Sequence, residues 1–350
     1  MTRQLDRSNI NRILIRATNW VGDAVMTLPA LEAVRENFPS ASITVLARPW
    51  VAPLFENHPA VNNILIYKRH DGLKKNISEF FHVINLVRKN RYDLAVLFQN
   101  AFEAALLAYL GRVTYRLGFD SDGRGFLLTH GIKRSSEIFA VHQVEYYLSI
   151  LKAAGLKAES RNPVLYLSIK DLAKAENLLQ LNGISKNDFI LGISPGAIFG
   201  NAKRWPFERF AKISDRASER WGAKVIILGS KKEKDIGNKM AGIMKNKAAD
   251  FCGTTSLGEA MGLISRCSFF VTNDSGLMHI AAALGVPAFA IFGSTDHVAT
   301  GPRGSKTKII RHDIACSPCL KPECPTDFKC MLSIEPEEVW DEMEKFRQAK

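Results

Sequence analysis

Asp23 is the first residue whose type and position suggest chemistry. It closes the motif NWVGD, which directly follows a predicted strand and stands where a helix begins. A carboxylate in that place can cap the helix by accepting a backbone N–H. It can equally serve as a general base at the mouth of a cleft. The residues alone leave both interpretations open.

Residues 194–206 combine a glycine, two adjacent cations and a helix start. Gly196 follows a predicted strand and lets the backbone approach a ligand, Lys203 and Arg204 come next, and Pro206 suits the first position of a helix. Cations beside the free N–H groups of a helix N-terminus suit a phosphate group. The alternative is an ordinary charged loop in solvent.

The segment VTNDSGLMH, residues 271–279, ends a strand in a tight polar turn and begins a helix of small residues. Ser275 and Gly276 would present free N–H groups at that helix start. Asp274 would accept from a ribose hydroxyl or hold the loop, and His279 is as consistent with a packed residue as with a catalyst. The density of polar residues at a strand end favours a binding function.

Two acidic features give less specific predictions. Glu233 begins a helix after a predicted strand, where its carboxylate would contact a sugar hydroxyl or simply complement the helix dipole. Asp120 and Asp122 form a D-x-D, a pattern that can hold a divalent metal on a nucleotide-sugar diphosphate. The surrounding sequence is rich in glycine and carries no preceding strand signal, so we predict an exposed turn and no catalytic metal.

Short apolar runs alternate with helical patterns along the whole chain, which predicts an α/β protein with two doubly wound domains. A short continuous apolar run is typical of a strand buried on both faces of a parallel sheet. Strands are expected over 12–17, 43–47, 64–67, 94–98, 189–194, 224–228, 269–272 and 288–292. Helices are expected over 23–37, 206–220, 233–244, 256–265 and 276–284.

The predicted domains are residues 1–175 and 186–333, with a polar helical segment near the boundary. A charged helix within 334–350 is expected to pack back toward the first domain. Ligands of doubly wound sheets bind at the carboxyl ends of the strands, where the segments described above lie. No G-x-G-x-x-G follows a predicted strand, which counts against a nicotinamide or flavin dehydrogenase.

The composition is that of a globular protein with excess positive charge. With 350 residues, 46% hydrophobic and 23% charged, the chain is long enough for two domains and is not largely disordered. The net charge of +12 favours a polyanionic partner: nucleic acid, an anionic membrane surface or a phosphorylated substrate. The apolar stretches are too short to span a membrane, and the polar N-terminus lacks a secretion signal, so we expect a cytoplasmic location.

Four of the six cysteines cluster at Cys316, Cys319, Cys324 and Cys330. The first pair has zinc-ligand spacing, and four thiolates can close a structural Cys₄ site. A cytoplasmic location disfavours stable disulfides. A structural metal, reduced thiols packed against the second domain, and a redox pair all remain open.

Three long segments, in this order, carry a resemblance to a known family: IRATNWVGDAVMTLPALEAVRENFP, PGAIFGNAKRWP and VTNDSGLMHIAAALGVPAFAIFG. The sequence resembles the ADP-heptose:lipopolysaccharide heptosyltransferases of glycosyltransferase family 9 over nearly its whole length. The heptosyltransferase II branch is the more similar one. The resemblance implies a GT-B fold, with two Rossmann-like domains facing across a cleft, the acceptor on the first and the nucleotide sugar on the second.

The same resemblance implies a role for individual residues. Asp23 matches the family's catalytic base, and Lys203 matches the lysine on the donor's diphosphate. The family's ribose- and phosphate-binding loop corresponds to Asp274, Ser275, Gly276 and Leu277, and Glu233 corresponds loosely to an acidic donor-site residue. The implied reaction is transfer of L-glycero-D-manno-heptose from ADP-heptose to the heptosyl-Kdo-lipid A inner core, with inversion and without a cofactor.

Other readings stay open beside this one. They are a family relative with another nucleotide-sugar donor or acceptor, including a heptosyltransferase I-type enzyme, and a non-catalytic nucleotide-binding protein. Nucleic acid is disfavoured because the basic residues are not interleaved with aromatic ones. The implied lipid acceptor predicts peripheral binding at the cytoplasmic face of the inner membrane, through basic residues of the first domain: Arg69, Lys74, Lys75, Arg124, Lys133 and Arg134.

Overall fold

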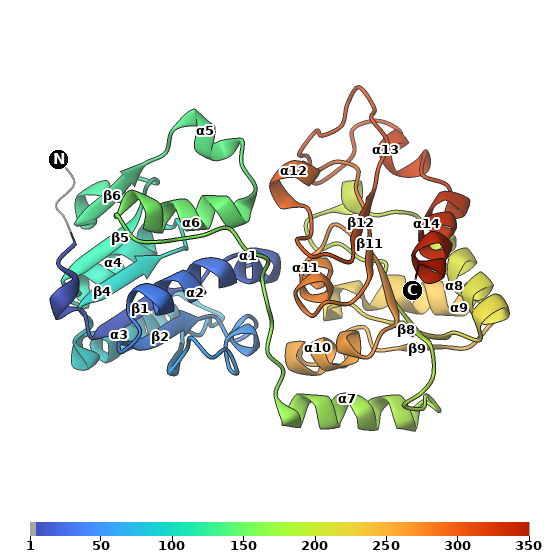
Figure 1. The fold of residues 1–350 in the computed structure, drawn as a ribbon, viewed down its shortest axis with the longest axis horizontal. Coiled ribbons are helices and arrows are strands. Elements are labelled where there is room, and N and C mark those ends of the chain that lie inside the picture. Colours follow the sequence, from blue (N-terminus) through green and yellow to red (C-terminus); the bar gives the residue numbers. More distant parts are fainter. Residues whose placement is uncertain (1–4, 350) are drawn as a thin grey trace. The chain divides into compact units, whose positions relative to one another are not determined.

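The computed structural model describes residues 5–349. Residues 1–4, which begin the polar N-terminal segment, and residue 350, which ends the expected C-terminal helix, lie outside the described residues. The chain divides into two compact units between Tyr166 and Leu167. Each unit holds one six-stranded sheet (Figure 1).

In the first unit the strands run in the order β3-β2-β1-β4-β5-β6, and every neighbouring pair is parallel. They are β1 (Arg12–Arg16), β2 (Ser42–Ala47), β3 (Asn63–Ile66), β4 (Leu94–Leu97), β5 (Tyr115–Asp120) and β6 (His130–Lys133). This order is that of a doubly wound sheet, whose chain reverses direction between β1 and β4.

The second unit repeats the arrangement, with the parallel order β12-β11-β10-β7-β8-β9. Its strands are β7 (Ile190–Ser194), β8 (Lys224–Ile227), β9 (Ala248–Asp250), β10 (Phe269–Asn273), β11 (Ala288–Ile291) and β12 (Thr307–Ile310). Here the direction reverses between β7 and β10. The expected α/β class with two doubly wound sheets is confirmed, and each of the strands expected from the sequence is present.

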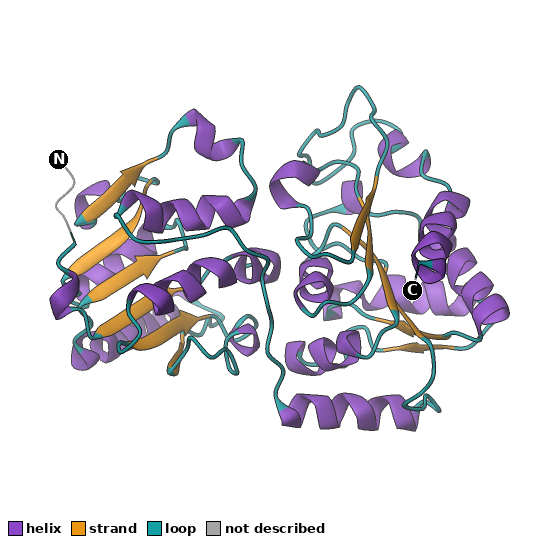
Figure 2. Ribbon diagram, in the orientation of Figure 1, coloured by secondary structure: helices purple, strands orange, loops and turns teal. Residues whose placement is uncertain are grey.

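Helices cover both faces of each sheet (Figure 2). The first unit has α1 (Val21–Met26), α2 (Leu28–Asn37), α3 (Leu73–Asn90), α4 (Phe102–Leu110), α5 (Ser136–Phe139) and α6 (Gln143–Ala153). Helices α2 and α6 pack together, as do α3 and α4. The single helix expected over 23–37 is two helices that meet at Thr27. Pro29 has no backbone N–H, so the helical hydrogen bonds do not continue without a break from α1 into α2.

The helices of the second unit are α7 (Ile169–Leu181), α8 (Phe207–Trp221), α9 (Lys234–Ile243), α10 (Leu257–Ser265), α11 (Gly276–Ala283), α12 (His297–Thr300), α13 (Lys329–Leu332) and α14 (Pro336–Gln348). Helix α7 packs closely on α10, where an added Cβ at Gly262 would lie 2.8 Å from the Ala175 Cβ. The first domain therefore ends before α7, earlier than the expected residue 175.

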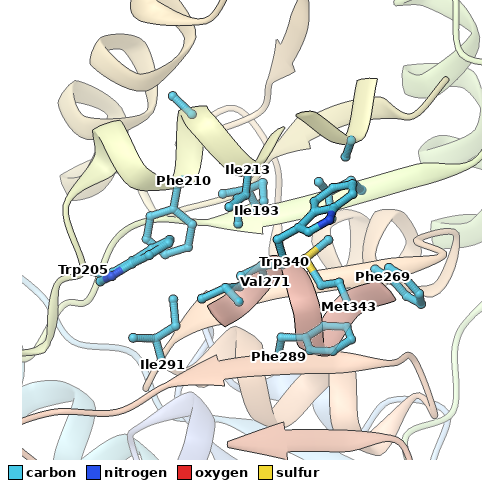
Figure 3. Close-up of a cluster of buried hydrophobic side chains, with 14 of the residues drawn as sticks. Ile193, Trp205, Phe210, Ile213, Phe269, Val271, Phe289, Ile291, Trp340 and Met343 are labelled. Carbon is cyan, nitrogen blue, oxygen red and sulfur yellow. The ribbon is translucent and has the colours of Figure 1, made fainter. Parts of the chain in front are cut away.

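The C-terminal helix α14 completes the core of the second unit. Trp340 is fully buried and stacks on Trp221 of α8 at 4.3 Å between ring centroids. Val339 and Met343 join the same buried cluster, which Figure 3 shows around Phe269 and Phe289 of the central strands. The charged helix expected within 334–350 is therefore part of the second unit, where its apolar face is buried, and its expected packing toward the first domain stays a prediction.

Within residues 5–349, none of the helices combines the length and the apolar character needed to cross a bilayer.

Candidate active site

Asp23 lies in the first turn of α1, directly after β1. The helix begins at Val21, and Trp20 is its N-cap residue. Asp23 is half-buried. The pKa of Tyr147 is raised first by the burial of Tyr147 and next by the negative charge of the Asp23 carboxylate. The N-cap interpretation is therefore wrong in its geometry, and the carboxylate stands at the carboxyl edge of the first sheet, where doubly wound proteins bind ligands.

Lys203 and Asp274 form a buried ion pair at the carboxyl edge of the second sheet. Lys203 Nζ lies 2.6 Å from Asp274 Oδ2, and the same oxygen accepts a hydrogen bond from Thr295 Oγ1 at 2.6 Å. The side chain of Asp274 is 6% exposed and that of Lys203 is 15% exposed. Two segments 71 residues apart are thereby joined. The local sequence gives no sign of Thr295, which contacts the site from the loop after β11.

Asn273 is a site residue that the sequence analysis did not single out. It ends β10 and is fully buried. Its Nδ2 donates to the carbonyl oxygens of Pro195 and Gly196, and its Oδ1 accepts from the Trp205 N–H at 3.0 Å. The side-chain amide of Asn273 therefore connects both ends of the loop over residues 195–205 to the end of β10, at the point where the strand order reverses between β7 and β10.

Glu233 is buried at the same edge, between the loops after β7 and β8. Its Oε2 accepts from the Ser230 N–H at 2.8 Å, and an added Cβ at Gly196 would lie only 2.1 Å from its Oε1. Gly196 is thus required by the close approach of the carboxylate. This contact favours the structural interpretation of Glu233, with a helix-start carboxylate held against the loop.

The start of α11 carries the remaining donor-site candidates. Ser275 is the N-cap residue, and its Oγ accepts from the Met278 N–H at 3.4 Å. Gly276 and Leu277 form the first turn and are half-exposed, whereas His279 is 5% exposed. Gly276 and Leu277 begin α11, and the backbone N–H groups of a helix's first turn are those that bind an anion. One smaller expectation is wrong: α8 begins at Phe207, so Pro206 is its N-cap residue and not its first helical residue.

The D-x-D at Asp120 and Asp122 is a turn, but a strand does precede it. Asp120 is the last residue of β5, and Asp122 has a φ of 52°. The expectation that no strand comes before this motif is wrong. The expectation of an exposed turn is confirmed, since both carboxyl-bearing residues are exposed.

The four clustered cysteines lie in the segment from 316 to 330, which is irregular up to α13. Cys330 is buried, whereas Cys316 is exposed and Cys319 and Cys324 are half-exposed. Within the part of the chain that is described, no group of three or more His, Cys, Asp or Glu is arranged to hold a metal ion. The geometry therefore gives no support to a Cys₄ centre, and the packed-thiol interpretation fits Cys330.

Cys324 is expected to be the most reactive thiol. Hydrogen bonds from Thr326 lower its pKa, whereas burial and the charges of the three other clustered cysteines raise that of Cys330. The larger thiolate fraction of Cys324 at neutral pH should give the fastest phase in a native thiol titration. Cys324→Ser should remove that phase alone, and Cys252→Ser should leave it unchanged. Stoichiometric zinc or iron in the purified protein would contradict this expectation.

Comparison with known proteins identifies the family. Residues 81–329 match the profile of glycosyltransferase family 9 (heptosyltransferase). The chain is 31% identical over 343 residues to lipooligosaccharide heptosyltransferase 2 of Campylobacter jejuni serotype O:6, covering 95% of this chain and 98% of that protein. It is 29% identical over 342 residues to lipopolysaccharide heptosyltransferase 2 of Escherichia coli K12, covering 95% and 97%.

The solved structure of E. coli ADP-heptose lps heptosyltransferase II is 28% identical, with a TM-score of 0.81 over 96% of this chain and 98% of that one. The family 9 glycosyltransferase of Veillonella parvula shares the fold, with a TM-score of 0.86 over 100% and 99% of the two chains, at 21% identity. The expected GT-B fold class is thereby confirmed. The chain belongs to glycosyltransferase family 9, the heptosyltransferases.

Proposed function

We propose that this glycosyltransferase transfers L-glycero-D-manno-heptose from ADP-heptose to the heptosyl-Kdo-lipid A inner core of lipopolysaccharide, with inversion. The proposal is carried by near-full-length similarity to proteins named heptosyltransferase 2 in several species. The second unit supplies charges suited to a nucleotide diphosphate, and the first supplies Asp23 at its ligand edge.

The chemistry assigns distinct tasks to the two edges. Asp23 accepts the proton of the attacking hydroxyl, whose own pKa is far too high for attack at neutral pH without a base. As the bond to the donor breaks, negative charge grows on the departing diphosphate. Lys203 and the N–H groups at the start of α11 are fixed positive groups suited to that charge. This step requires no metal, and turnover should persist in EDTA.

The test is a matrix of donors and acceptors with the full chain. Heptose addition to the lipid acceptor is followed by mass spectrometry, with ADP-heptose, ADP-glucose and UDP-glucose as donors. Each donor is paired with acceptors that carry or lack the first heptose. We expect product only from ADP-heptose with the heptosylated acceptor. Product on the acceptor that lacks heptose would indicate a heptosyltransferase I-type enzyme, turnover of another donor would indicate a different relative, and no turnover would favour a binding protein.

We further propose that the first half of α3, residues 73–81, and the basic residues near it attach the enzyme reversibly to an anionic membrane surface. Leu73, Ile77 and Phe81 recur every fourth residue on α3 and are 76%, 46% and 54% exposed. Exposed lysines stand next to this apolar stripe, at Lys74 and Lys75. An exposed apolar helix face flanked by cations is typical of interfacial binding.

The other basic candidates divide into two groups. Arg69 follows β3, and Lys133 ends β6 with Arg134 after it, so all three lie on the exposed carboxyl side of the first sheet. Arg124 is removed from the set, because it is fully buried and its guanidinium donates to the carbonyl of Phe119 and to Asn100 Oδ1. It fastens loops and cannot meet a lipid headgroup.

Vesicle sedimentation tests the membrane proposal. Because each cation near an anionic surface contributes about 1 kcal/mol, the double substitution K74Q/K75Q should weaken binding by roughly tenfold or more at low salt. K245Q/K247Q, on exposed residues of the second unit, removes the same charge and should have little effect. Binding that ignores both salt and the anionic lipid fraction would contradict the proposal.

A further inference from the structure

Two buried arginines stand at the carboxyl edge of the first sheet, outside the site described so far. Arg16 is the last residue of β1, and Arg48 follows β2 directly, on the neighbouring strand. They are 3% and 8% exposed. Burial, and next the charge of Arg48, lower the pKa of Arg16 to about 10, so the Arg16 guanidinium is still charged at neutral pH.

Their partners are mostly neutral oxygens. Arg16 donates to the Ala17 carbonyl and to Asn19 Oδ1, and Arg48 donates to the carbonyls that follow β3. The Nε of Arg16 is buried and has no hydrogen-bond partner. Carbonyl dipoles solvate a guanidinium but do not neutralise it, and a buried charge without a counter-charge is costly.

Glu103 supplies the one carboxylate paired with either arginine among residues 5–349. Its Oε1 lies 3.5 Å from Arg48 Nη2, a loose contact, and its side chain is 45% exposed. The ring of Tyr67 lies 3.9 Å from the Arg48 guanidinium and 5.7 Å from that of Arg16. Two buried positive charges therefore share one half-exposed carboxylate and an aromatic ring, so this pair of guanidinium groups keeps an excess of positive charge.

We propose that Arg16 and Arg48 form a subsite for an anionic group of the acceptor, a carboxylate or a phosphate monoester. This inference rests on the proposed function for the identity of the ligand. The ligand's anion would take the place beside Arg48 that the Glu103 carboxylate, which also hydrogen-bonds to the side chain of Tyr67, now has. A guanidinium binds such groups through paired N–H donors. Glu103 is exposed enough to turn into solvent.

The position of the pair supports an acceptor role. Arg16 ends the strand that leads into the NWVGD loop, and Arg48 follows the neighbouring strand. The Nη2 of Arg16 donates to Asn19 Oδ1 of that loop at 3.2 Å. The Trp50 Nε1 donates to the Asn19 carbonyl at 2.8 Å, and Trp50 and Trp20 are 46% and 61% exposed. Exposed aromatic faces beside a buried cation suit a ligand that is part sugar and part anion.

A purely structural role is the competing explanation, because both arginines bond to backbone carbonyls at strand ends. A double-mutant cycle that combines enzyme variants with modified acceptors distinguishes anion binding from a purely structural role. Wild type, Arg48→Gln and Lys89→Gln are compared on native acceptor, on acceptor freed of phosphates by phosphatase, and on acceptor whose carboxylates are reduced to alcohols. Lys89 is an exposed cation at the end of α3, before β4, and its loss removes the same charge.

We expect one of the two modifications to lower the acceptor kcat/KM of wild type and of Lys89→Gln by about tenfold or more, as loss of a charged hydrogen bond does. In Arg48→Gln the same modification should lower the acceptor kcat/KM by less than about twofold, because the guanidinium that binds the anionic group is already absent. The modification that behaves in this way identifies the group as phosphate or carboxylate. Donor KM should stay unchanged. Equal losses in all three enzymes would overturn the proposal.

A second measurement is independent of turnover. The Nε–H signal of Arg16, assigned by its disappearance in Arg16→Lys, is followed by NMR during titration with inorganic phosphate and, separately, with acetate. We expect a saturable shift with one anion, retained in Lys89→Gln and lost in Arg48→Gln, and retained in Arg48→Lys, which keeps the charge. No shift with either anion would refute the subsite. Absence of heptose transfer would refute the proposed function alone.

Discussion

Asp23→Asn should lower kcat by about 10² to 10⁴-fold while it leaves the fold and the donor affinity intact. The amide has the size of the carboxylate but cannot accept the proton of the attacking hydroxyl. The half-buried position of Asp23 in the first turn of α1 places this change at the ligand edge of the first sheet. Single-turnover rates with saturating donor and acceptor measure the chemical step directly.

Glu337→Gln is the matched control for this prediction. It removes a carboxylate from the first turn of α14 in the same way, and Glu337 is exposed on the surface of the second unit. We expect wild-type turnover from that variant. Thermal unfolding of both variants checks the fold, and titration with ADP checks the donor site. A near-normal kcat in Asp23→Asn would mean that the carboxylate serves the helix and that another group takes the proton.

Lys203→Ala should lower kcat/KM for the donor on the order of 10²-fold, the usual effect of removing one fixed group that stabilises the leaving charge. Lys203 Nζ is held 2.6 Å from Asp274, so the cation is positioned before any ligand arrives. Its loss also removes the cation from the buried Asp274 carboxylate, which still accepts a hydrogen bond from the Thr295 hydroxyl. The uncompensated negative charge of Asp274 then repels the diphosphate. ADP affinity should fall with the rate, while acceptor KM stays similar.

Lys239→Ala provides the comparison for Lys203. It removes a lysine that is paired with Asp235 on the exposed face of α9, and it should change neither donor KM nor rate. An unchanged donor KM and rate in Lys203→Ala would make Lys203 an ordinary loop cation. A loss of stability without a loss of ADP affinity would show that the ion pair only holds the loop.

The sequence was most informative where residues near in the chain act together. Buried strands such as β1 and β10 contain a continuous apolar run, and the NDSG turn predicts a helix start beside a strand end. Strands β5, β6, β9 and β12 were not predicted, because they are short or carry polar residues such as Arg116 and Lys308. Strands β6, β9 and β12 are edge strands with one neighbour each, so their sequences need not be uniformly apolar, whereas β5 lies between β4 and β6.

The site residues that were missed depend on contacts between distant segments. Thr295 has no local signal, and Asn273 belongs to the NDSG turn but its own role is not visible there. The contacts of both depend on the strand order that brings β7, β10 and β11 together. Arg16 and Arg48 look like ordinary charges until pairing of β1 with β2 buries them side by side. Arg124 was predicted to be exposed at a membrane surface because it is a charged residue in a glycine-rich turn. That prediction is wrong, since Arg124 is fully buried.

The place of Trp340 in the second core sets the order in which the two units can fold during synthesis. The first unit has all its strands by Lys133 and its last helix by Ala153, so it can fold while the ribosome still makes the rest of the chain. The second unit cannot close its core until α14 has been made, because Trp340 of that helix stacks on Trp221. Premature termination within α14 would therefore release a chain with one finished unit and one open apolar core, a species prone to aggregation.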